Sequence, residues 1–256
     1  MQNDDFGRDD AAPMAAAVPP SVSSEELAQF EQFKRLKRVE KARARIAKTE
    51  CDMLSPAAGR AELKSLCREA GRVALGGIVV LPAYVSPCVA YLGDDPSCSL
   101  IAAVSHPHGG DALAGKMAAV KRAVKDGADE VEVCAPYFAV REGNMAYFRR
   151  ECKKLKKAAK PRALRVVLDC ALLSESDVVR ACNVAAESGA NAVRLVNVPA
   201  LSFVASAKSA LRDRCLLKVD AAGAAAMDEA EALGASLVNC PEAVGVCSEL
   251  LAEANR

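Results

Sequence analysis

Short runs of apolar, mostly β-branched residues alternate with longer mixed segments from about residue 46 to the end of the chain. The apolar runs predict eight strands: Ile46–Glu50 (the weakest), Ile78–Leu81, Leu100–Val104, Glu130–Cys134, Leu164–Asp169, Ala192–Val196, Cys215–Val219 and Ser236–Cys240. The intervening segments predict helices, including Ala57–Ala70, Asp111–Lys125, Met145–Ala159, Ser174–Glu187 and Asp228–Leu233. Strands that alternate with helices indicate a parallel sheet, and a count of eight favours a closed (β/α)₈ TIM barrel over an open sheet.

Glycine residues mark several of the predicted boundaries between a helix and the next strand. The pairs Gly127-Ala128, Gly189-Ala190 and Gly234-Ala235 each precede a predicted strand. Glycine at such a position accepts the left-handed conformation that ends a helix. The positions of these glycines therefore agree with the predicted alternation of helices and strands.

The first 48 residues do not follow this alternation. Residues 1–22 mix Asp, Ala and Pro without periodicity, which predicts a disordered tail. Ser23 and Glu26 have the spacing of a capping box, which predicts the start of a helix. That helix, over residues 23–48, becomes strongly basic after residue 34. The predicted organisation is a tail, a basic N-terminal helix and a barrel over residues 46–256.

Composition narrows the class of protein. Apolar residues make up 52% of the chain, but aromatic residues only 4% and there is no Trp, so Ala, Val and Leu must fill the core. The eleven cysteines lack paired spacing, which is typical of reduced thiols rather than of a disulfide framework. The apolar runs are interrupted by Gly and Pro, and the acidic N-terminus is unlike a secretory signal. We therefore expect a soluble cytoplasmic protein that does not bind membranes.

Several motifs, in order along the chain, resemble the deoxyribose-phosphate aldolase family. The clearest is Gly127-Ala128-Asp129-Glu130-Val131-Glu132-Val133, continuing to Gly143-Asn144, which resembles the family's fourth strand. Further similar stretches are Leu66–Ala70, His106–Gly109 and Val166–Asp169. Together they extend over residues 46–254, so the resemblance implies a class I aldolase barrel.

The resemblance also implies where an active site would lie. The family forms a Schiff base with a lysine on the sixth strand, where this chain has Arg194, and keeps a second lysine on the seventh strand, here Lys218. The strand-four aspartate that assists proton transfer corresponds to Glu132, a strand-five lysine to Arg165, and the first-strand aspartate to Glu50. A guanidinium stays protonated and is a poor nucleophile, so Arg194 cannot replace the reacting amine.

The positions that correspond to the family's phosphate site have also changed. Candidate substrate-binding residues are Asn197, Gly223 and Asn239, at the turns after strands six, seven and eight. Small residues in such turns expose backbone N–H groups to an anion. Pro199 removes one donor, and Glu242 would repel a phosphate. Both changes argue against the parent substrate.

Each candidate has a structural interpretation beside the functional one. Arg194 is expected to neutralise Glu132 inside the barrel mouth, because a buried carboxylate requires a partner. Alternatively, its fixed charge would favour a neutral, nucleophilic amine at Lys218. His106 and His108 are expected to be a surface loop pair rather than metal ligands, so neither a metal nor a cofactor is expected. The thiols near the mouth are interpreted as small core fillers.

Two basic stretches are candidates for partner binding. One covers residues 34–48, and the other lies on the helix after residue 145. The second stretch comprises Arg149, Arg150, Lys153, Lys154, Lys156 and Lys157. Most such runs are solvated faces, but two in a chain of net charge +1 imply local positive patches for an acidic protein surface. No nucleic-acid-binding motif accompanies them.

The sequence therefore predicts an aldolase-like barrel without 2-deoxyribose 5-phosphate cleavage that serves as a binding or scaffold protein. By analogy with glycolytic aldolases, the candidate partner is a filament such as actin. The alternative is an active lyase that uses Lys218 as a relocated Schiff-base nucleophile, with Glu132 as proton carrier, on another small aldehyde, ketone or sugar.

Overall fold

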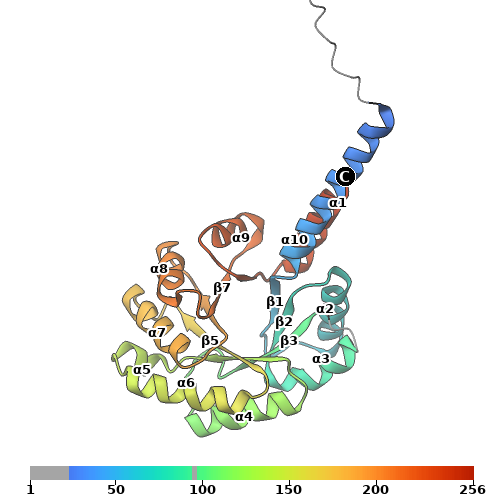
Figure 1. The fold of residues 1–256 in the computed structure, drawn as a ribbon. Helices are drawn as coiled ribbons and strands as arrows, with labels where there is room; N and C mark the ends of the chain where they lie inside the picture. The colour runs from blue at the N-terminus through green and yellow to red at the C-terminus, as the bar shows by residue number, and fades with distance from the viewer. Residues whose placement is uncertain (1–22, 94–96) are drawn as a thin grey trace, which may run out of the picture.

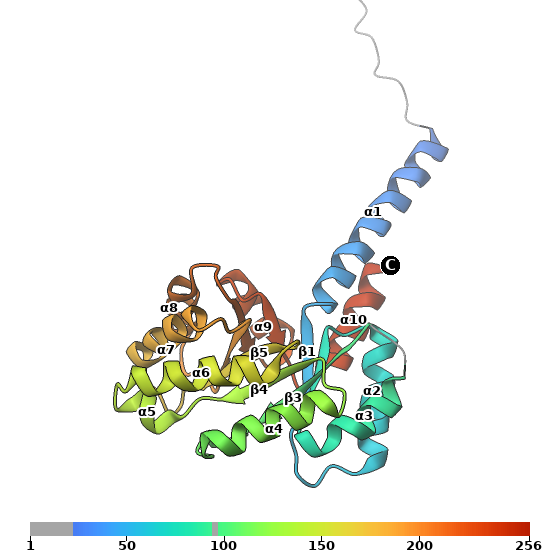
Figure 2. The same ribbon diagram turned by 60° about the horizontal axis from the view of Figure 1, so that its bottom comes forward.

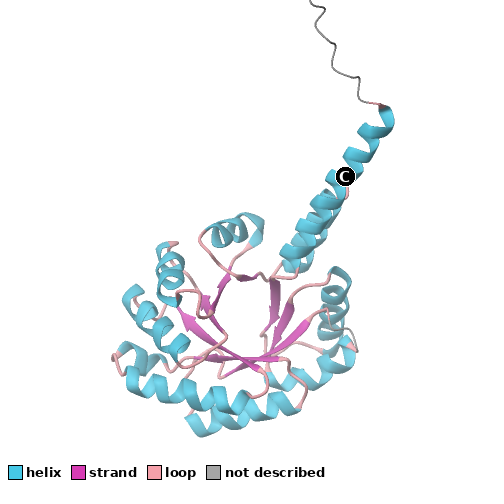
Figure 3. Cartoon of the chain, in the orientation of Figure 1, coloured by secondary structure: helices cyan, strands magenta, loops and turns pink. Residues whose placement is uncertain are grey.

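The computed structural model describes residues 23–93 and 97–256, and the tail predicted for residues 1–22 lies outside them. Within this part, eight parallel strands close into a barrel in chain order, β1 to β8, and helices surround it (Figures 1 and 3). The strands are β1 (Thr49–Met53), β2 (Gly77–Val80), β3 (Ser99–Val104), β4 (Glu130–Cys134), β5 (Ala163–Asp169), β6 (Ala192–Val196), β7 (Leu216–Asp220) and β8 (Leu237–Asn239). The predicted (β/α)₈ architecture is confirmed.

The first strand begins three residues later in the chain than predicted. The first was expected at Ile46–Glu50, but Ile46 is the last residue of helix α1 and β1 begins at Thr49. Ile46 is apolar because it is buried beneath the barrel as a helical residue, not because it belongs to a strand. The shift matters for function, since it places Asp52 within the strand, close to the mouth.

The helices follow the predicted alternation but are more numerous than the sequence pattern indicated. They are α1 (Ser24–Ile46), α2 (Arg60–Val73), α3 (Val85–Leu92), α4 (Leu113–Lys125), α5 (Tyr137–Arg141), α6 (Met145–Ala159), α7 (Glu175–Glu187), α8 (Ser202–Leu211), α9 (Gly223–Ala232) and α10 (Ala243–Ala254), with a short 3₁₀ turn at Pro82–Tyr84. Helices α3, α5, α8 and α10 were not predicted. Gly127, Gly189 and Gly234 all have positive φ angles, which confirms their predicted role in ending helices.

Small aliphatic residues and cysteines fill the space between strands and helices. All eleven cysteine side chains are buried, and several of them, including Cys134, Cys170 and Cys240, belong to the main apolar cluster. Burial raises the pKa of the Cys134 thiol to about 11, so this group stays protonated at neutral pH. These observations agree with the interpretation of the thiols as core fillers.

Helix α1 begins with the predicted capping box and ends against the barrel. The Ser23 side chain accepts from the Glu26 backbone N–H, and the Glu26 carboxylate accepts from the Ser23 backbone N–H at 2.8 Å. At the other end, Arg45 forms ion pairs with Asp228 at 2.6 Å and Glu231 at 2.9 Å. The first half of α1 extends away from the barrel into solvent (Figures 1 and 2).

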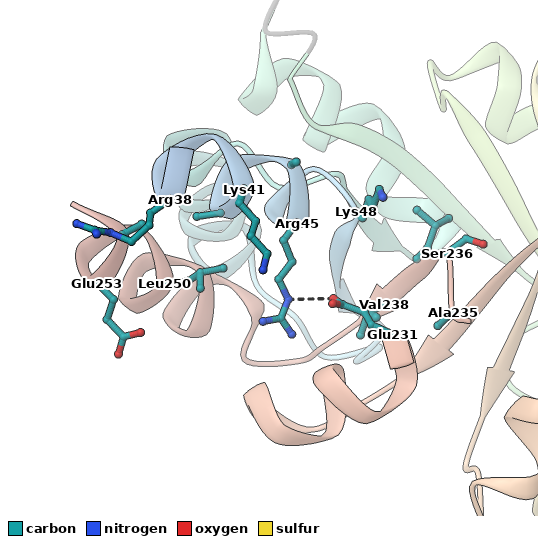
Figure 4. Close-up of a pocket in the computed structure, with 14 residues that line it drawn as sticks. Arg38, Lys41, Arg45, Lys48, Glu231, Ala235, Ser236, Val238, Leu250 and Glu253 are labelled. Carbon is teal, nitrogen blue, oxygen red and sulfur yellow. Dashed lines mark hydrogen bonds and ion pairs between the residues drawn. The ribbon is translucent and has the colours of Figure 1, made fainter. Parts of the chain in front are cut away.

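A cavity of about 660 Å³ lies beneath the barrel, between α1, α10 and the start of β8. Lys41 and Arg45 of α1 line it together with Leu250 of α10 and Val238 of β8, and Arg45 is held toward Glu231 (Figure 4). Lys48, before β1, also lines it, so the cavity lies at the end of the barrel opposite the strands' carboxyl ends. None of the described helices is both long and apolar enough to cross a membrane.

Candidate active site

The barrel interior contains the charged residues that the sequence singled out. In the strand register, Glu132 lies opposite Arg165, and Arg194 lies opposite Lys218. None of the four residues is more than 4% exposed. Because side chains alternate along each strand, these four turn into the barrel rather than toward the helices. The structure thus brings together all four residues predicted as catalytic.

The Lys218 amine is enclosed between two carboxylates. Its Nζ lies 2.5 Å from Glu50 Oε2 and 2.7 Å from Glu132 Oε1, and the side chain is 0% exposed. Glu50, which the resemblance matches to the family's first-strand aspartate, is a direct partner of this amine. Lys218 is therefore part of a buried ion-pair network.

The Arg194 guanidinium is held by three carboxylates. It donates to both Asp220 oxygens at 2.7 and 2.9 Å, to Glu132 Oε2 at 2.9 Å and to Asp52 Oδ2 at 2.6 Å. The expected contact with Glu132 is present, but Asp52 and Asp220 were not predicted. A signal for both existed in the sequence: each lies two residues after an interior residue of the same strand, Glu50 and Lys218 respectively, and strand periodicity puts it on the same face.

Arg165 completes the network on the other side of Glu50. Its Nη1 donates to both Glu50 oxygens at 2.7 and 2.9 Å, while Nε and Nη2 bind the two oxygens of Glu130 at 2.7 Å each. Such bidentate pairs fix the guanidinium plane. Glu130, at the start of β4, was likewise not predicted as part of the site.

Burial and neighbouring charges act against each other on the carboxylates of this network. Burial alone would raise the pKa of Glu132, but Lys218, Arg194 and Arg165 outweigh it and hold that pKa well below its ordinary value. The pKa of Glu50 is lowered in the same way, with the Lys218 and Arg165 charges overcoming burial. For Asp220 burial prevails over Arg194, so its pKa is raised.

Glu132 separates the two cations that the sequence placed side by side. One of its oxygens binds Lys218 and the other binds Arg194. The hypothesis that Arg194 acts on the Lys218 amine by direct repulsion therefore lacks the geometry it needs, since an intervening carboxylate balances both charges.

A cavity of about 190 Å³ opens at the carboxyl ends of the strands. Its walls include Asp52, Glu132, Asp169, Arg194 and Asp220, together with His106, Tyr137 and Asn197. No lysine is among the described residues that line it. Active sites of (β/α)₈ barrels lie at this end, so this cavity is the candidate ligand site.

Of the three predicted substrate-binding residues, the structure brings only Asn197 to this cavity. Asn197 has a positive φ of 52° and donates to Asp169 at 3.1 Å. Asn239 is buried behind the lining and donates to Asp52 at 2.8 Å. Gly223 begins α9 and does not line the cavity.

The two histidines lie on the loop after β3, and both side chains are exposed. His106 lines the mouth cavity, whereas His108 does not. Among the described residues, no group of three or more His, Cys, Asp or Glu side chains is placed to hold a metal ion.

Negative charge predominates at the mouth and in the interior beneath it. Among the described strand residues there, carboxylates outnumber cations by six to three. The carboxylates are Glu50, Asp52, Glu130, Glu132, Asp169 and Asp220. The cations are Arg165, Arg194 and Lys218. An excess of fixed negative charge in a narrow cavity repels anions and attracts cations. The charge around this cavity therefore favours a cationic or neutral group over an anion.

The predicted basic patch lies on α6, and not all of its six side chains are free to contact a partner. Arg149 is engaged with Glu187 at 2.7 Å, and Lys156 donates to Asn191 at 2.5 Å. The remaining four side chains are exposed: Arg150, Lys153, Lys154 and Lys157. These four are called the α6 basic surface below.

Comparison with known proteins places this geometry in context. The model of the DeoC/LacD family of aldolases matches residues 42–212 of this chain. The chain is 31% identical over 174 residues to a deoxyribose-phosphate aldolase of Syntrophotalea carbinolica, covering 67% of this chain and 78% of that one. It is 30% identical over 142 residues to one of Clostridium botulinum (strain Loch Maree / Type A3), covering 56% of this chain and 66% of that relative, just under two thirds of its length.

Solved structures agree on the fold. A putative deoxyribose-phosphate aldolase from Coccidioides immitis superposes with a TM-score of 0.74 at 22% identity, covering 90% of this chain and 98% of that one. An aldolase called QR15 gives a TM-score of 0.76 at 16% identity, with 82% and 96% covered. At sequence identities this low, the two superpositions show a shared barrel fold only.

Proposed function

Because the chain belongs to the DeoC/LacD family of aldolases, we propose that it is a member that binds a small molecule at the barrel mouth without cleaving 2-deoxyribose 5-phosphate. The observation that carries this proposal is the absence of a lysine among the described residues lining the mouth cavity. Class I aldol cleavage requires an amine that can reach the substrate carbonyl. Arg194 occupies the position that the family resemblance gives to that amine.

The arrangement of Arg194 supports a structural role for this side chain rather than a catalytic one. Its donors are committed to Asp52, Glu132 and Asp220. The side chain is also 3% exposed, so it contributes more to the architecture of the site than to contact with a ligand.

The alternative, a lyase that uses Lys218, is less well supported by the geometry. The amine forms ion pairs with two carboxylates, and it does not line the cavity. A carbonyl compound in the mouth would have to displace the network before it could reach Nζ. No specific observation favours this second candidate.

The charge of the cavity indicates the class of ligand. Asp52, Asp169 and Asp220 lie around the opening and Glu132 beneath it, against the one guanidinium that lines the cavity. We expect a neutral or cationic small molecule with hydroxyl or amino groups, which would donate hydrogen bonds to carboxylate oxygens.

Borohydride trapping tests the proposal. The protein is incubated with 2-deoxyribose 5-phosphate or with small aldehydes, reduced, and analysed by peptide mass spectrometry beside an active aldolase of the family. We expect no adduct on Lys218 and no cleavage. The Arg194→Lys variant is also expected to form no adduct, because Asp52, Glu132 and Asp220 would surround the new amine and favour its charged form. Arg194→Met is the control that lacks any amine at this position. An adduct on Lys218, or cleavage by the unaltered protein, would overturn the proposal.

We also propose that the α6 basic surface binds an acidic protein surface, with an actin-type filament as the candidate. The support is that Arg150, Lys153, Lys154 and Lys157 are exposed on one helix, whereas Arg149 and Lys156 are engaged with side chains of their own chain. Clustered exposed cations attract a polyanionic partner in a salt-dependent manner.

Co-sedimentation with actin filaments at low and high salt tests this surface. Reversing Lys153, Lys154 and Lys157 to Glu is expected to lower the bound fraction about tenfold or more at low salt. The matched control reverses Arg60, Lys64 and Arg68 on α2, which are also exposed, and should leave binding nearly unchanged. Equal binding by both triple variants would show that the α6 basic surface is not the contact.

A further inference from the structure

The projecting half of α1 carries large apolar side chains that nothing in the described chain covers. Leu27, Phe30, Phe33 and Leu36 are each between 53% and 61% exposed. Figures 1 and 2 show this half extending beyond the barrel and beyond the end of α10. A helix of three or four turns without tertiary packing is only marginally stable in water. Its apolar residues therefore indicate a surface that is covered when the protein functions.

The exposed aromatic residues belong to one face of the helix. Glu26, Phe30, Phe33 and Lys37 are separated by four, three and four residues, the spacing that aligns side chains along a helix–helix contact. We call these four residues the outer face of α1.

The rest of the protein binds the reverse side of α1. Ala42 and Ile46 are buried against the barrel, and Arg35 Nη2 donates to Asn255 Oδ1, next to the end of α10, at 3.3 Å. At about 100° per residue, the side formed by Arg35, Ala42 and Ile46 lies roughly opposite the outer face. A second helix can therefore approach the outer face without meeting α10.

The sequence of residues 26–37 is complementary to the same sequence read in the opposite direction. About a centre between Glu31 and Gln32, Phe30 corresponds to Phe33 and Leu27 to Leu36. Across the same centre, Glu26 corresponds to Lys37. Antiparallel alignment of two such segments thus sets phenylalanine against phenylalanine and acid against base, as a two-fold interface between identical chains requires. Leu27 and Leu36 are nine residues and about 180° apart, so they lie on opposite flanks of this contact.

We propose that α1 is a self-association arm, through which two copies of this chain pair in antiparallel orientation by their outer faces. Phe30 packs against the partner's Phe33 at the centre, and Glu26 pairs with the partner's Lys37 at each end. Leu27 and Leu36 flank the aromatic pairs. Because the arms overlap only near their first halves, the two barrels lie at opposite ends of the pair.

Glu26 keeps its capping-box bonds to Ser23, which use Oε2 alone, and its Oε1 is the atom that faces the partner's Lys37. The other contacts of the outer face within its own chain are weak enough to exchange. Lys37 pairs with Glu40 at 2.8 Å and Lys34 with Glu31 at 2.9 Å, all with largely exposed side chains. Lys34 also lies over the Phe30 ring at 4.3 Å. Exposed pairs of this kind contribute little net free energy, so replacing them with buried aromatic contacts is favourable.

Sedimentation equilibrium of the full chain at micromolar concentrations tests the proposal. The unaltered protein is expected to show a monomer–dimer equilibrium. Phe33→Glu is expected to raise the dissociation constant about tenfold or more, because it buries unpaired charge at the centre of the interface. Gln32→Glu, one residue away and off the outer face, is the matched control. Circular dichroism of each variant verifies that the barrel remains folded.

A charge exchange tests the antiparallel orientation. Glu26→Lys alone and Lys37→Glu alone should each weaken the dimer, since each places like charges opposite each other. The double variant, and an equimolar mixture of the two single variants, should both recover association. Because the double variant and the Glu26→Lys chains also lack the capping box, recovery separates charge pairing from loss of the cap. A monomer at all concentrations, a dimer insensitive to Phe33→Glu, or no recovery in both the double variant and the mixture would overturn the proposal.

Discussion

Replacing Lys218 with methionine is expected to lower the free energy of unfolding by about 3–5 kcal/mol, because it leaves Glu50 and Glu132 without a shared cation inside the barrel. Methionine keeps most of the volume of the side chain, so the loss reports charge rather than a cavity. Urea denaturation followed by circular dichroism measures the effect. Lys208→Met is the control: its ion pair with Asp213 is exposed, and its removal should cost less than about 0.5 kcal/mol.

A second variant separates the charge effect from general disruption. Adding Glu132→Gln to Lys218→Met removes one of the two stranded carboxylates, and part of the lost stability should return because neighbouring substitutions are not additive. A Lys218→Met protein as stable as the unaltered chain would show that the two carboxylates share their protons or draw in water, so that the amine is not needed to balance them.

The barrel could be predicted from the sequence because each strand is a short apolar run of its own between helices. Glu130–Cys134 and Ala192–Val196 were predicted with the bounds that the structure shows. The helices that were missed lack a clear amphipathic signal: α8 and α10 are rich in Ala, Ser and Val, and α5 spans only five residues. The first strand was misplaced because Ile46, the apolar residue taken as its start, ends a helix.

The charged residues of the site were predictable one by one, but their partners were not. Arg194, Lys218, Glu132 and Arg165 stand out against apolar strands, since a charged residue in a buried strand demands an explanation. Which carboxylate each cation binds depends on the barrel's closure, which brings Glu50 of β1 to Lys218 of β7. Glu50 and Lys218 are 168 residues apart in the sequence, so no local sequence pattern encodes their contact.

The network explains how a barrel with so many interior charges folds at all. Each cation is shared by at least two carboxylates, and Glu50 and Glu132 each bind more than one cation. Ionised groups tolerate burial only with such pairing. Arg194, Lys218, Glu132 and Arg165, the residues that the family resemblance matches to catalytic positions, are thus largely occupied with one another, and this occupancy supports the proposed binding role.

Acid is expected to destabilise the protein through this network. The pKa values of Glu50 and Glu132 are lowered from 4.5 in the folded state, with burial opposing but the neighbouring cations prevailing. Below pH 4.5 the unfolded chain therefore takes up protons that the folded chain does not, and the free energy of unfolding falls as the pH is lowered. Each such group contributes a slope of about 1.4 kcal/mol per pH unit. Asp220, whose pKa burial raises, contributes with the opposite sign in its own titration range.

Urea denaturation between neutral pH and pH values below 4.5 measures this dependence. Glu132→Gln supplies the internal comparison: the variant should be less stable at neutral pH, since an amide cannot balance Lys218 and Arg194, and its stability should fall less steeply in acid by about 1.4 kcal/mol per pH unit. Replacing an exposed glutamate, Glu253→Gln, should leave the stability at neutral pH unchanged. If the Glu132→Gln protein loses stability in acid as steeply as the unaltered chain, then Glu132 does not remain ionised in the folded barrel, and the network of shared charges would need another source for its balance.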